Sequence, residues 1–392
     1  MPGKYWQLQS IIHNRLHVKS IFDYYDRIRE GTINTRRFKH QDILPLIEKR
    51  NKKVFQIERI GASYENRAIY MLKAGTGKKI IMLWSQMHGN EPTGTAALFD
   101  LFNFFESPGK LSGDIEKILN NCTLWFIPML NPDGAERFQR RNAQEIDINR
   151  DALRLISPEG NLLNEKVDEV KPDFGFNLHD QDIWYSAGNT SNPATLSFLA
   201  PSYNTEKQTD ACRAKSMRLI ASITKELSLY IPKQIAKYSD DFMPTAFGDQ
   251  IQKKGVSTVL IESGGYLNDP EKQYVRKLNF LALLHAFTFI SSGASEPDGV
   301  ETYHKIPFNV KNKLFDCMIR QAKIEGEHSD YHVDIGIRSQ PSAHADTFMI
   351  DDIGDLSGSF AYIEKTVTNP IPPVKIGEDA GAFMHRYFNT PQ

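Results

Sequence analysis

The stretch Lys79-Ile-Ile-Met-Leu-Trp-Ser-Gln-Met-His-Gly-Asn-Glu91 decides the fold. Its apolar first part predicts a buried strand, and Pro92 and Thr93 mark the start of a helix with apolar residues at helical spacing. A buried strand that leads into a helix is typical of a largely parallel sheet covered by helices. His88 and Glu91 are therefore expected at the carboxyl end of a central strand, where sites form in open α/β sheets.

Polar residues that could complete a site recur in four later segments. These are Asn131-Pro-Asp-Gly134, Asp147-Ile-Asn-Arg-Asp151, Phe176-Asn-Leu-His179 and Leu260-Ile-Glu-Ser-Gly-Gly265. Two histidines and a carboxylate are typical ligands of a catalytic zinc, since three protein ligands leave a fourth position for water. Glu262 ends a β-branched run that should be buried, where a carboxylate is costly without a partner or a function. It could remove a proton from that water.

Structural interpretations of these residues stay open at this point. His88 and Glu91 could be solvated residues on the first turn of a helix, and His179 could be a hydrogen-bonded histidine at the rim of the sheet. Glu262 could belong to an ion pair. His328, His332 and His344 suggest a second metal site, but their flanks lack regular ligand spacing and we do not predict one.

The ordered motifs resemble those of the zinc metallocarboxypeptidases, the carboxypeptidase A-like family, from roughly Asn51 to Ser291. By that resemblance, the ligands of one zinc ion per chain are His88, Glu91 and His179, and Glu262 is the general base. Asp147 falls where the family places a carboxylate behind its first zinc histidine. Such a carboxylate accepts the second N–H of the metal-bound imidazole.

The resemblance also implies two groups that contact substrate. Asn149 and Arg150 match the clamp for the terminal carboxylate of a peptide, which a guanidinium can bind bidentately. The alternative for Arg150 is a surface ion pair with a neighbouring aspartate. Arg140 matches the arginine that polarises the scissile carbonyl. Arg141 is its rival, because neighbours on an extended segment point in opposite directions.

Two features depart from the well-studied digestive members of the family. Those enzymes carry a mobile tyrosine roughly twenty residues before the general base. Here Tyr238 lies slightly early for that role, while Phe242 and Phe247 have no hydroxyl group. The pair Asp180-Gln181 after His179 stands where those members have small or hydroxyl residues.

Composition excludes several other classes of protein. The formal net charge of −1 gives no electrostatic case for a nucleic-acid or membrane partner. The first ten residues contain no continuous apolar segment, so no signal peptide is predicted, nor is any stretch apolar enough to span a bilayer. Three widely spaced cysteines argue against a disulfide framework. We therefore expect a cytoplasmic protein; no feature of the sequence predicts an oligomeric state.

Three regions are expected along the 392 residues. Residues 1–50 should be a helical N-terminal extension, residues 51–291 the catalytic domain, and residues 300–392 a β-rich C-terminal domain of unknown role. The fold class is α/β, with a mixed, largely parallel central sheet sandwiched by helices and a small β-rich domain after it. Strands are predicted at 54–60, 67–73, 79–86, 122–128, 173–178 and 257–262, and helices at 93–105, 207–229 and 269–291.

Three functions follow from the resemblance. The first is a zinc-dependent metallocarboxypeptidase that hydrolyses the C-terminal peptide bond of a peptide with a free carboxylate, through a zinc-bound water activated by Glu262. The second is a zinc-dependent N-acyl amino acid deacylase, because the His-Gly-Asn-Glu string also occurs in such amidohydrolases. The third is a non-catalytic relative that binds zinc or peptides.

Overall fold

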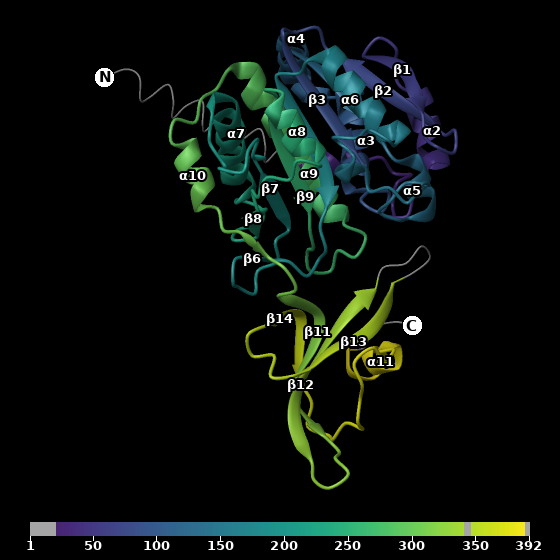
Figure 1. Ribbon diagram of the computed structural model, residues 1–392, viewed down its shortest axis with the longest axis vertical. Coiled ribbons are helices and arrows are strands. Elements are labelled where there is room, and N and C mark those ends of the chain that lie inside the picture. Colours follow the sequence, from purple (N-terminus) through teal and green to yellow (C-terminus); the bar gives the residue numbers. More distant parts are fainter. Residues whose placement is uncertain (1–20, 341–345, 389–392) are drawn as a thin grey trace.

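An eight-stranded sheet organises the larger part of the computed structural model, which describes residues 21–340 and 346–388 (Figure 1). The strand order is β1-β2-β4-β3-β5-β9-β7-β8. The bounds are β1 Phe55–Ala62, β2 Ala68–Ala74, β3 Lys79–Ser85, β4 Cys122–Ile127, β5 Phe174–Asp180, β7 Leu196–Leu199, β8 Ile235–Lys237 and β9 Ser257–Ser263. The four central strands β4, β3, β5 and β9 are parallel, whereas β1, β2 and β7 introduce antiparallel pairs.

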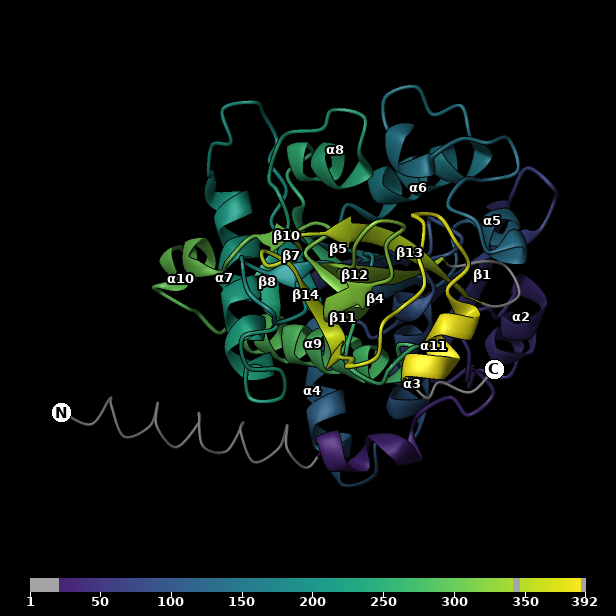
Figure 2. The same cartoon turned by 90° about the horizontal axis from the view of Figure 1, so that it is seen from below.

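Helices cover both faces of this sheet, and each face has its own apolar core. On one face lie α3 (Thr93–Glu106), α4 (Ser112–Asn121), α7 (Ala211–Leu227) and α9 (Gln273–Ser292). On the other lie α6 (Pro158–Val170) and α8 (Phe247–Lys253); Figure 2 shows them across the sheet from α3 and α9. Alternate residues of β3 enter the two cores, so the run from Ile81 to Trp84 is fully buried. The predicted α/β class is confirmed.

Within residues 21–50, the described part of the N-terminal segment, helices alternate with a loop. Residues 21–24 are helical and lead into the 3-10 helix η1 (Tyr25–Arg27), and α2 spans His40–Glu48. Between them, residues 28–39 form turns and loops, so the expectation of a helical segment up to residue 50 is wrong there. Gly31 and the β-branched residues around it favour helix weakly. Residues 1–20 lie outside the described residues.

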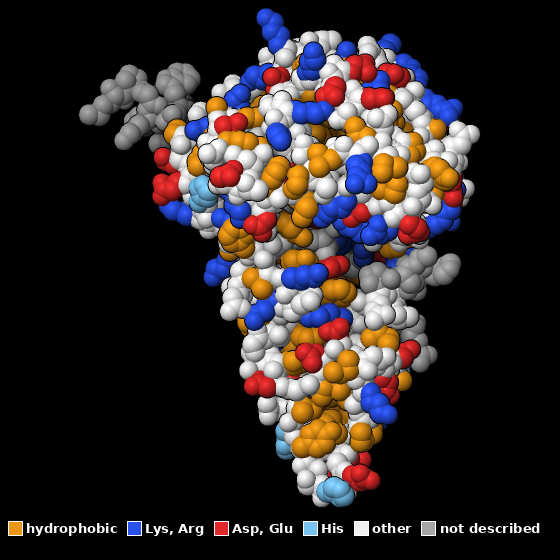
Figure 3. All heavy atoms as spheres, in the orientation of Figure 1, with side chains coloured by type: hydrophobic (Ala, Val, Ile, Leu, Met, Phe, Trp, Pro, Cys, Tyr) orange, Lys and Arg blue, Asp and Glu red, His pale blue; other side chains and the backbone are white. Residues whose placement is uncertain are grey.

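A second, four-stranded sheet forms a lobe at one end of the α/β body (Figure 1). Its order is β13-β12-β11-β14, from β11 Leu314–Ile324, β12 Tyr331–Gln340, β13 Thr347–Gly354 and β14 Phe360–Thr366. The helix α11 (Gly381–Phe388) completes its core. In the space-filling view this lobe tapers away from the broad body (Figure 3). The predicted small β-rich part of the fold is confirmed.

A short connection joins the two parts. The helix α10 (Gly299–Lys305) follows the turn-rich segment after α9, and β10 (Asn309–Val310) then pairs with β6 (Ser186–Ala187) of the larger part. All three cysteines are free, and Cys122 is buried. Within residues 21–340 and 346–388, no helix has the length and apolar character required to cross a membrane.

Candidate metal centre

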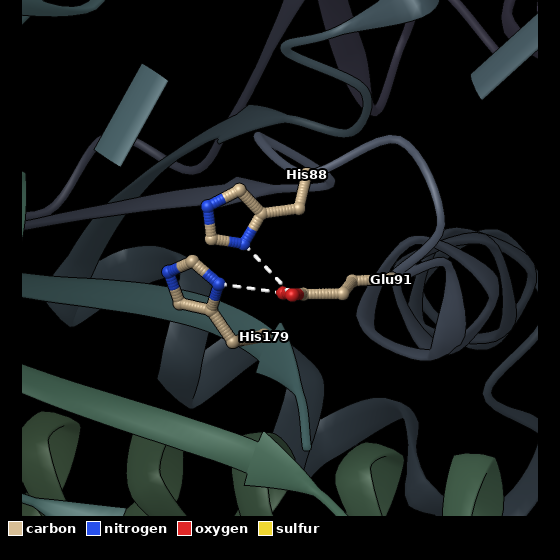
Figure 4. Close-up of side chains that lie close together, drawn as sticks. All are labelled: His88, Glu91 and His179. Carbon is tan, nitrogen blue, oxygen red and sulfur yellow. Dashed lines mark hydrogen bonds and ion pairs between the residues drawn. The ribbon is translucent and has the colours of Figure 1, made fainter. Parts of the chain in front are cut away.

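His88, Glu91 and His179 meet at the carboxyl ends of two adjacent strands. His88 and Glu91 lie between β3 and α3, and His179 lies in β5, which pairs in parallel with β3. His88 Nδ1 is 2.8 Å from one carboxylate oxygen of Glu91, and His179 Nδ1 is 2.7 Å from the other. Figure 4 shows both rings turned toward this carboxylate. All three side chains are buried, and their potential ligand atoms lie within 4.8 Å of one another.

The chemistry of this donor set fits a divalent zinc ion. Two imidazole nitrogens and one carboxylate are a usual ligand set for an open, catalytic zinc site. Burial lowers the pKa of His179, which favours the neutral imidazole that a metal requires. Burial opposes the charge of Glu91, but the two imidazoles outweigh it and hold the pKa of its carboxyl well below the ordinary value. His88, Glu91 and His179 are therefore suited to hold the metal.

Asp147 fixes the orientation of the His88 ring. His88 Nε2 lies 3.0 Å from Asp147 Oδ1, and the same oxygen accepts a hydrogen bond from the backbone N–H of Asn149 at 3.0 Å. A proton on Nε2 leaves Nδ1 free on the side that faces Glu91. Burial opposes ionisation of Asp147, yet its hydrogen bond to His88 lowers its pKa. This is the arrangement expected for a carboxylate behind a zinc histidine.

The Asn131-Pro-Asp-Gly134 motif supports the loop that carries His88. Asn131 Nδ2 donates to the carbonyl of Met87 at 3.1 Å, and Asn131 Oδ1 accepts from the N–H of Gly134 at 2.8 Å. A Cβ atom on Gly89 would lie 1.9 Å from the backbone carbon of Gly134. The two backbones thus approach so closely that only glycine fits at position 89.

The two candidate arginines at positions 140 and 141 point in different directions. Arg140 Nη1 lies 3.2 Å from Glu91 Oε1, and its Nη2 lies 3.1 Å from Asp147 Oδ2. Arg141 instead donates to the carbonyl of Glu145 at 2.7 Å. Arg140 lines the cavity in front of the three candidate ligands, as the sequence-based preference for it requires.

Asn149 and Arg150 also line this cavity, from the 3-10 helix η3 (Ile148–Arg150). Asn149 Oδ1 accepts a hydrogen bond from the N–H of Phe247 at 3.0 Å, and Arg150 Nη1 donates to the carbonyl of Asn149 at 2.7 Å. The guanidinium is exposed, so its remaining donors are accessible to an anion from the cavity.

Glu262 lies beside His179 on the next strand. The register pairs the two residues directly across β5 and β9, and Glu262 lines the cavity. Burial and the neighbouring carboxylates of Glu91 and Asp180 raise the pKa of Glu262 well above its usual value. A perturbed carboxyl group beside a metal-type donor set is typical of a catalytic acid or base.

A buried lysine, which the sequence did not indicate, contacts the residues that follow His179 and Glu262. Lys272 Nζ is 3.3 Å from Asp180 Oδ2 and donates to the carbonyls of Gln181 and Ser263 at 3.1 and 2.7 Å. It therefore links the ends of the strands that carry His179 and Glu262. Asp180, the acidic residue after His179, is thus paired with Lys272. No local motif could have predicted this ion pair, because the two residues are far apart in sequence.

The candidates for the mobile tyrosine and for a second metal site lie in different parts of the structure. Tyr238 lines the cavity with its ring 6.3 Å from that of Tyr185, whereas Phe247 is buried in a core. Within the described part of the chain, the triad above is the only group of potential metal ligands, and it includes neither His328 nor His332. His344 lies outside the described residues.

Comparison with known proteins identifies the family of this chain. The family model of zinc carboxypeptidases matches residues 41–240, just over half of the chain. The chain belongs to the zinc carboxypeptidase family. The family resemblance is thereby confirmed, and this family is zinc-dependent. The matched range includes the three candidate ligands and ends before Glu262 and the C-terminal lobe.

Curated relatives are similar over part of their length. Probable carboxypeptidase 2 from Trichophyton verrucosum is 29% identical over 115 residues, which cover 29% of this chain and 21% of that protein. Carboxypeptidase B from Astacus astacus is 25% identical over 185 residues, which cover 46% of this chain and 56% of that protein. The chain thus spans about a fifth of the first relative and just over half of the second.

Solved structures share the fold at low identity. A metallo-carboxypeptidase from Burkholderia cenocepacia superposes with a TM-score of 0.51 at 17% identity, covering 65% of this chain and 69% of the other. Carboxypeptidase A from Helicoverpa armigera gives a TM-score of 0.52 at 14% identity, covering 71% and 81%. These similarities support the α/β fold.

Proposed function

We propose that this protein is a zinc-dependent carboxypeptidase that removes the C-terminal residue from peptides. One observation carries the proposal: one cavity joins the His88–Glu91–His179 donor set, Glu262 on the adjacent strand, and the terminal-carboxylate candidate Arg150. Family membership supports a metallopeptidase hydrolase, and the positions of the cavity residues support the specific roles proposed below.

The proposed roles follow from the position of each side chain. His88, Glu91 and His179 would hold one zinc ion. When bound there, zinc would supply Lewis-acid polarisation of the scissile carbonyl and acidify the attacking water. Asp147 keeps the proton of His88 on Nε2 and so leaves Nδ1 to the metal.

The other groups handle the proton, the developing charge and the position of the substrate. Glu262 takes the proton of the attacking water on a carboxylate oxygen and then gives it to the leaving amine nitrogen. The guanidinium of Arg140 stabilises the negative charge that develops on the carbonyl oxygen. Arg150 and Asn149 hold the terminal carboxylate, which places the last peptide bond beside Glu262.

The experiment that tests this proposal follows the products. Zinc-loaded protein is incubated with a blocked peptide that has a free C-terminus, and the products are identified by mass spectrometry. We expect release of the last residue alone, loss of activity with a chelator, and recovery when zinc is added back. Internal cleavage, or release from the amino end, would contradict the proposal.

An N-acetyl amino acid is the matched substrate for the deacylase alternative. It offers the same free carboxylate to Arg150 but has no peptide bond between two residues. Hydrolysis of N-acetyl amino acids alone would favour deacylation over peptide trimming.

A further inference from the structure

The C-terminal lobe closes one side of the cavity that contains the candidate metal centre. This cavity has a volume of about 760 Å³. Its walls include the metal-centre residues from the α/β body and, from the lobe, Lys311, Ser339, Phe348, Tyr362, Ile363 and Met384. The lobe therefore contributes directly to the space that a substrate would occupy.

The lobe holds the loop that follows His179, residues 182–185. The N–H groups of Lys313 and Leu314 both lie 3.1 Å from the carbonyl of Trp184. The indole Nε1 of Trp184 donates to Asp316 at 2.8 Å. The hydroxyl of Tyr362 donates to the carbonyl of Ile183 at 2.6 Å. Backbone and side-chain bonds thus hold this loop against the lobe.

The lobe also packs against the chain that follows Glu262. A Cβ atom on Gly265 would lie 2.1 Å from the hydroxyl oxygen of Tyr362, so glycine is needed for this approach. Asp316, which accepts from Trp184, also accepts from the N–H of Ser339 at 2.7 Å, and so ties β11 to β12 at the contact. The same lobe therefore contacts the segments after both His179 and Glu262.

The size of the cavity indicates the kind of substrate. Cavities of about 300–1,000 Å³ are typical of small-molecule sites. A peptide held by its carboxylate at Arg150, with its last peptide bond beside Glu262, must extend its amino-terminal part through what remains of the cavity. Residues of the lobe line this cavity.

We propose that the C-terminal lobe is a fixed roof that restricts this enzyme to short peptides and excludes long or folded polypeptides. This inference rests on the proposed carboxypeptidase function and deepens it. The roof acts by steric exclusion, so it discriminates by the length of the chain on the amino side of the cleaved bond and is indifferent to the C-terminal carboxylate.

The test measures hydrolysis across a length series. The substrates are an N-acetyl amino acid, a blocked dipeptide, a tripeptide, a hexapeptide and a decapeptide with the same last two residues. We expect kcat/KM to fall by at least about tenfold between the tripeptide and the decapeptide in the wild-type protein. Equal kcat/KM for the two peptides would overturn the proposal that the lobe is a roof, but it would not contradict the carboxypeptidase function.

Opposite substitutions at Ile363 sharpen the test. Ile363 lines the cavity from β14 and is 37% exposed, so its replacement should leave the fold intact. Ile363→Ala should raise the decapeptide-to-tripeptide ratio, and Ile363→Trp should lower it. Tyr331→Ala is the matched control, because Tyr331 is an exposed residue of the same sheet that does not line the cavity. Identical ratios in all four proteins would overturn the proposal.

A binding measurement distinguishes failure of the roof proposal from failure of the proposed carboxypeptidase function. If no substrate in the series is cleaved, the proposed function fails, and zinc-loaded Glu262→Gln protein is titrated with the tripeptide and the decapeptide by calorimetry. Binding of the tripeptide alone supports the roof. Equal binding of both, or binding of neither, overturns it.

Discussion

The carboxylate of Glu91 brings together two histidines from different parts of the chain. Each of its oxygens faces one Nδ1 atom, at 2.8 Å for His88 and 2.7 Å for His179. These three side chains would hold a zinc ion and would leave a fourth position for water. Removal of either imidazole should therefore lower the affinity of the site for zinc.

His179→Ala should lower zinc occupancy sharply, because the two remaining ligands cannot close the site. We expect about one zinc per chain in the wild-type protein by elemental analysis. His304→Ala is the control, since His304 is exposed on α10. Full zinc occupancy with unchanged affinity in His179→Ala would show that the ligand assignment is wrong.

Glu262→Gln tests the proton transfer separately from the metal. The amide is nearly isosteric with the carboxylate but cannot take a proton, so turnover should fall by at least about 100-fold. Zinc content and the free energy of unfolding should stay close to those of the wild-type protein. Turnover near the wild-type rate in a zinc-loaded sample would remove Glu262 from the mechanism.

A buried network joins the N-terminal segment to the elements that carry the site. Arg276 of α9 contacts Asp100 of α3 through two nitrogens, and the hydroxyl of Tyr25 donates to Asp100 at 2.6 Å. Glu30 bonds to Lys49 at 3.0 Å and to the hydroxyl of Thr32 at 2.9 Å. Residues outside the predicted catalytic domain therefore help to fix α3, whose start follows Glu91.

Glu30 should make the stability of this segment dependent on pH. Burial opposes its charge, but the hydrogen bonds from Lys49 and Thr32 outweigh burial and lower the pKa of Glu30 to about 2. A depressed pKa stabilises the folded state above the unfolded-state value of about 4.3, and that stability is lost as the pH falls toward about 2. The contribution at neutral pH is at most about 3 kcal/mol.

Glu30→Gln should therefore lower the free energy of unfolding at pH 7, and the deficit should shrink as the pH falls from about 5 toward 3. Urea unfolding at several pH values measures it. Glu48→Gln, at an exposed position of α2, is the control. A deficit that stays constant from pH 7 to pH 3 would contradict the assigned pKa.

Apolar runs predicted the central strands closely, whereas other elements were missed. The observed bounds of β3 and β4 lie within one residue of those predicted, because both strands are buried on two faces. The helices α4 and α6 were not predicted, and they are amphipathic segments with little apolar content. Helix was expected at residues 28–39, where the structure has a loop. Distant partners such as Asp100 hold this loop, and the local sequence does not reveal them.

Motif order predicted the candidate ligands, but it could not predict their surroundings. The bond between Lys272 and Asp180 joins residues from different elements and has no local signature. The same holds for the lobe, whose Tyr362 contacts the loop after His179. In both cases the contact depends on how separate elements pack, which residue type and spacing do not determine.

The molecule as a whole combines a mixed, largely parallel sheet that gathers the chemical groups with a second sheet whose residues line their cavity. We propose that the expected regions 51–291 and 300–392 cooperate at this site. The central claim is that the site recognises a free C-terminal carboxylate. Arg150 is the group that would make this recognition, and its guanidinium is exposed to the cavity.

The most direct measurement compares two enzymes on two substrates. Wild-type and Arg150→Met proteins are assayed on one short peptide with a free C-terminus and on its amidated form. We predict that amidation lowers wild-type kcat/KM by about 30- to 1,000-fold, which corresponds to about 2–4 kcal/mol for a charge-assisted contact. Arg150→Met should be slow on both and nearly insensitive to the difference. Equal cleavage of the free and amidated peptides by the wild-type protein would contradict the carboxypeptidase function.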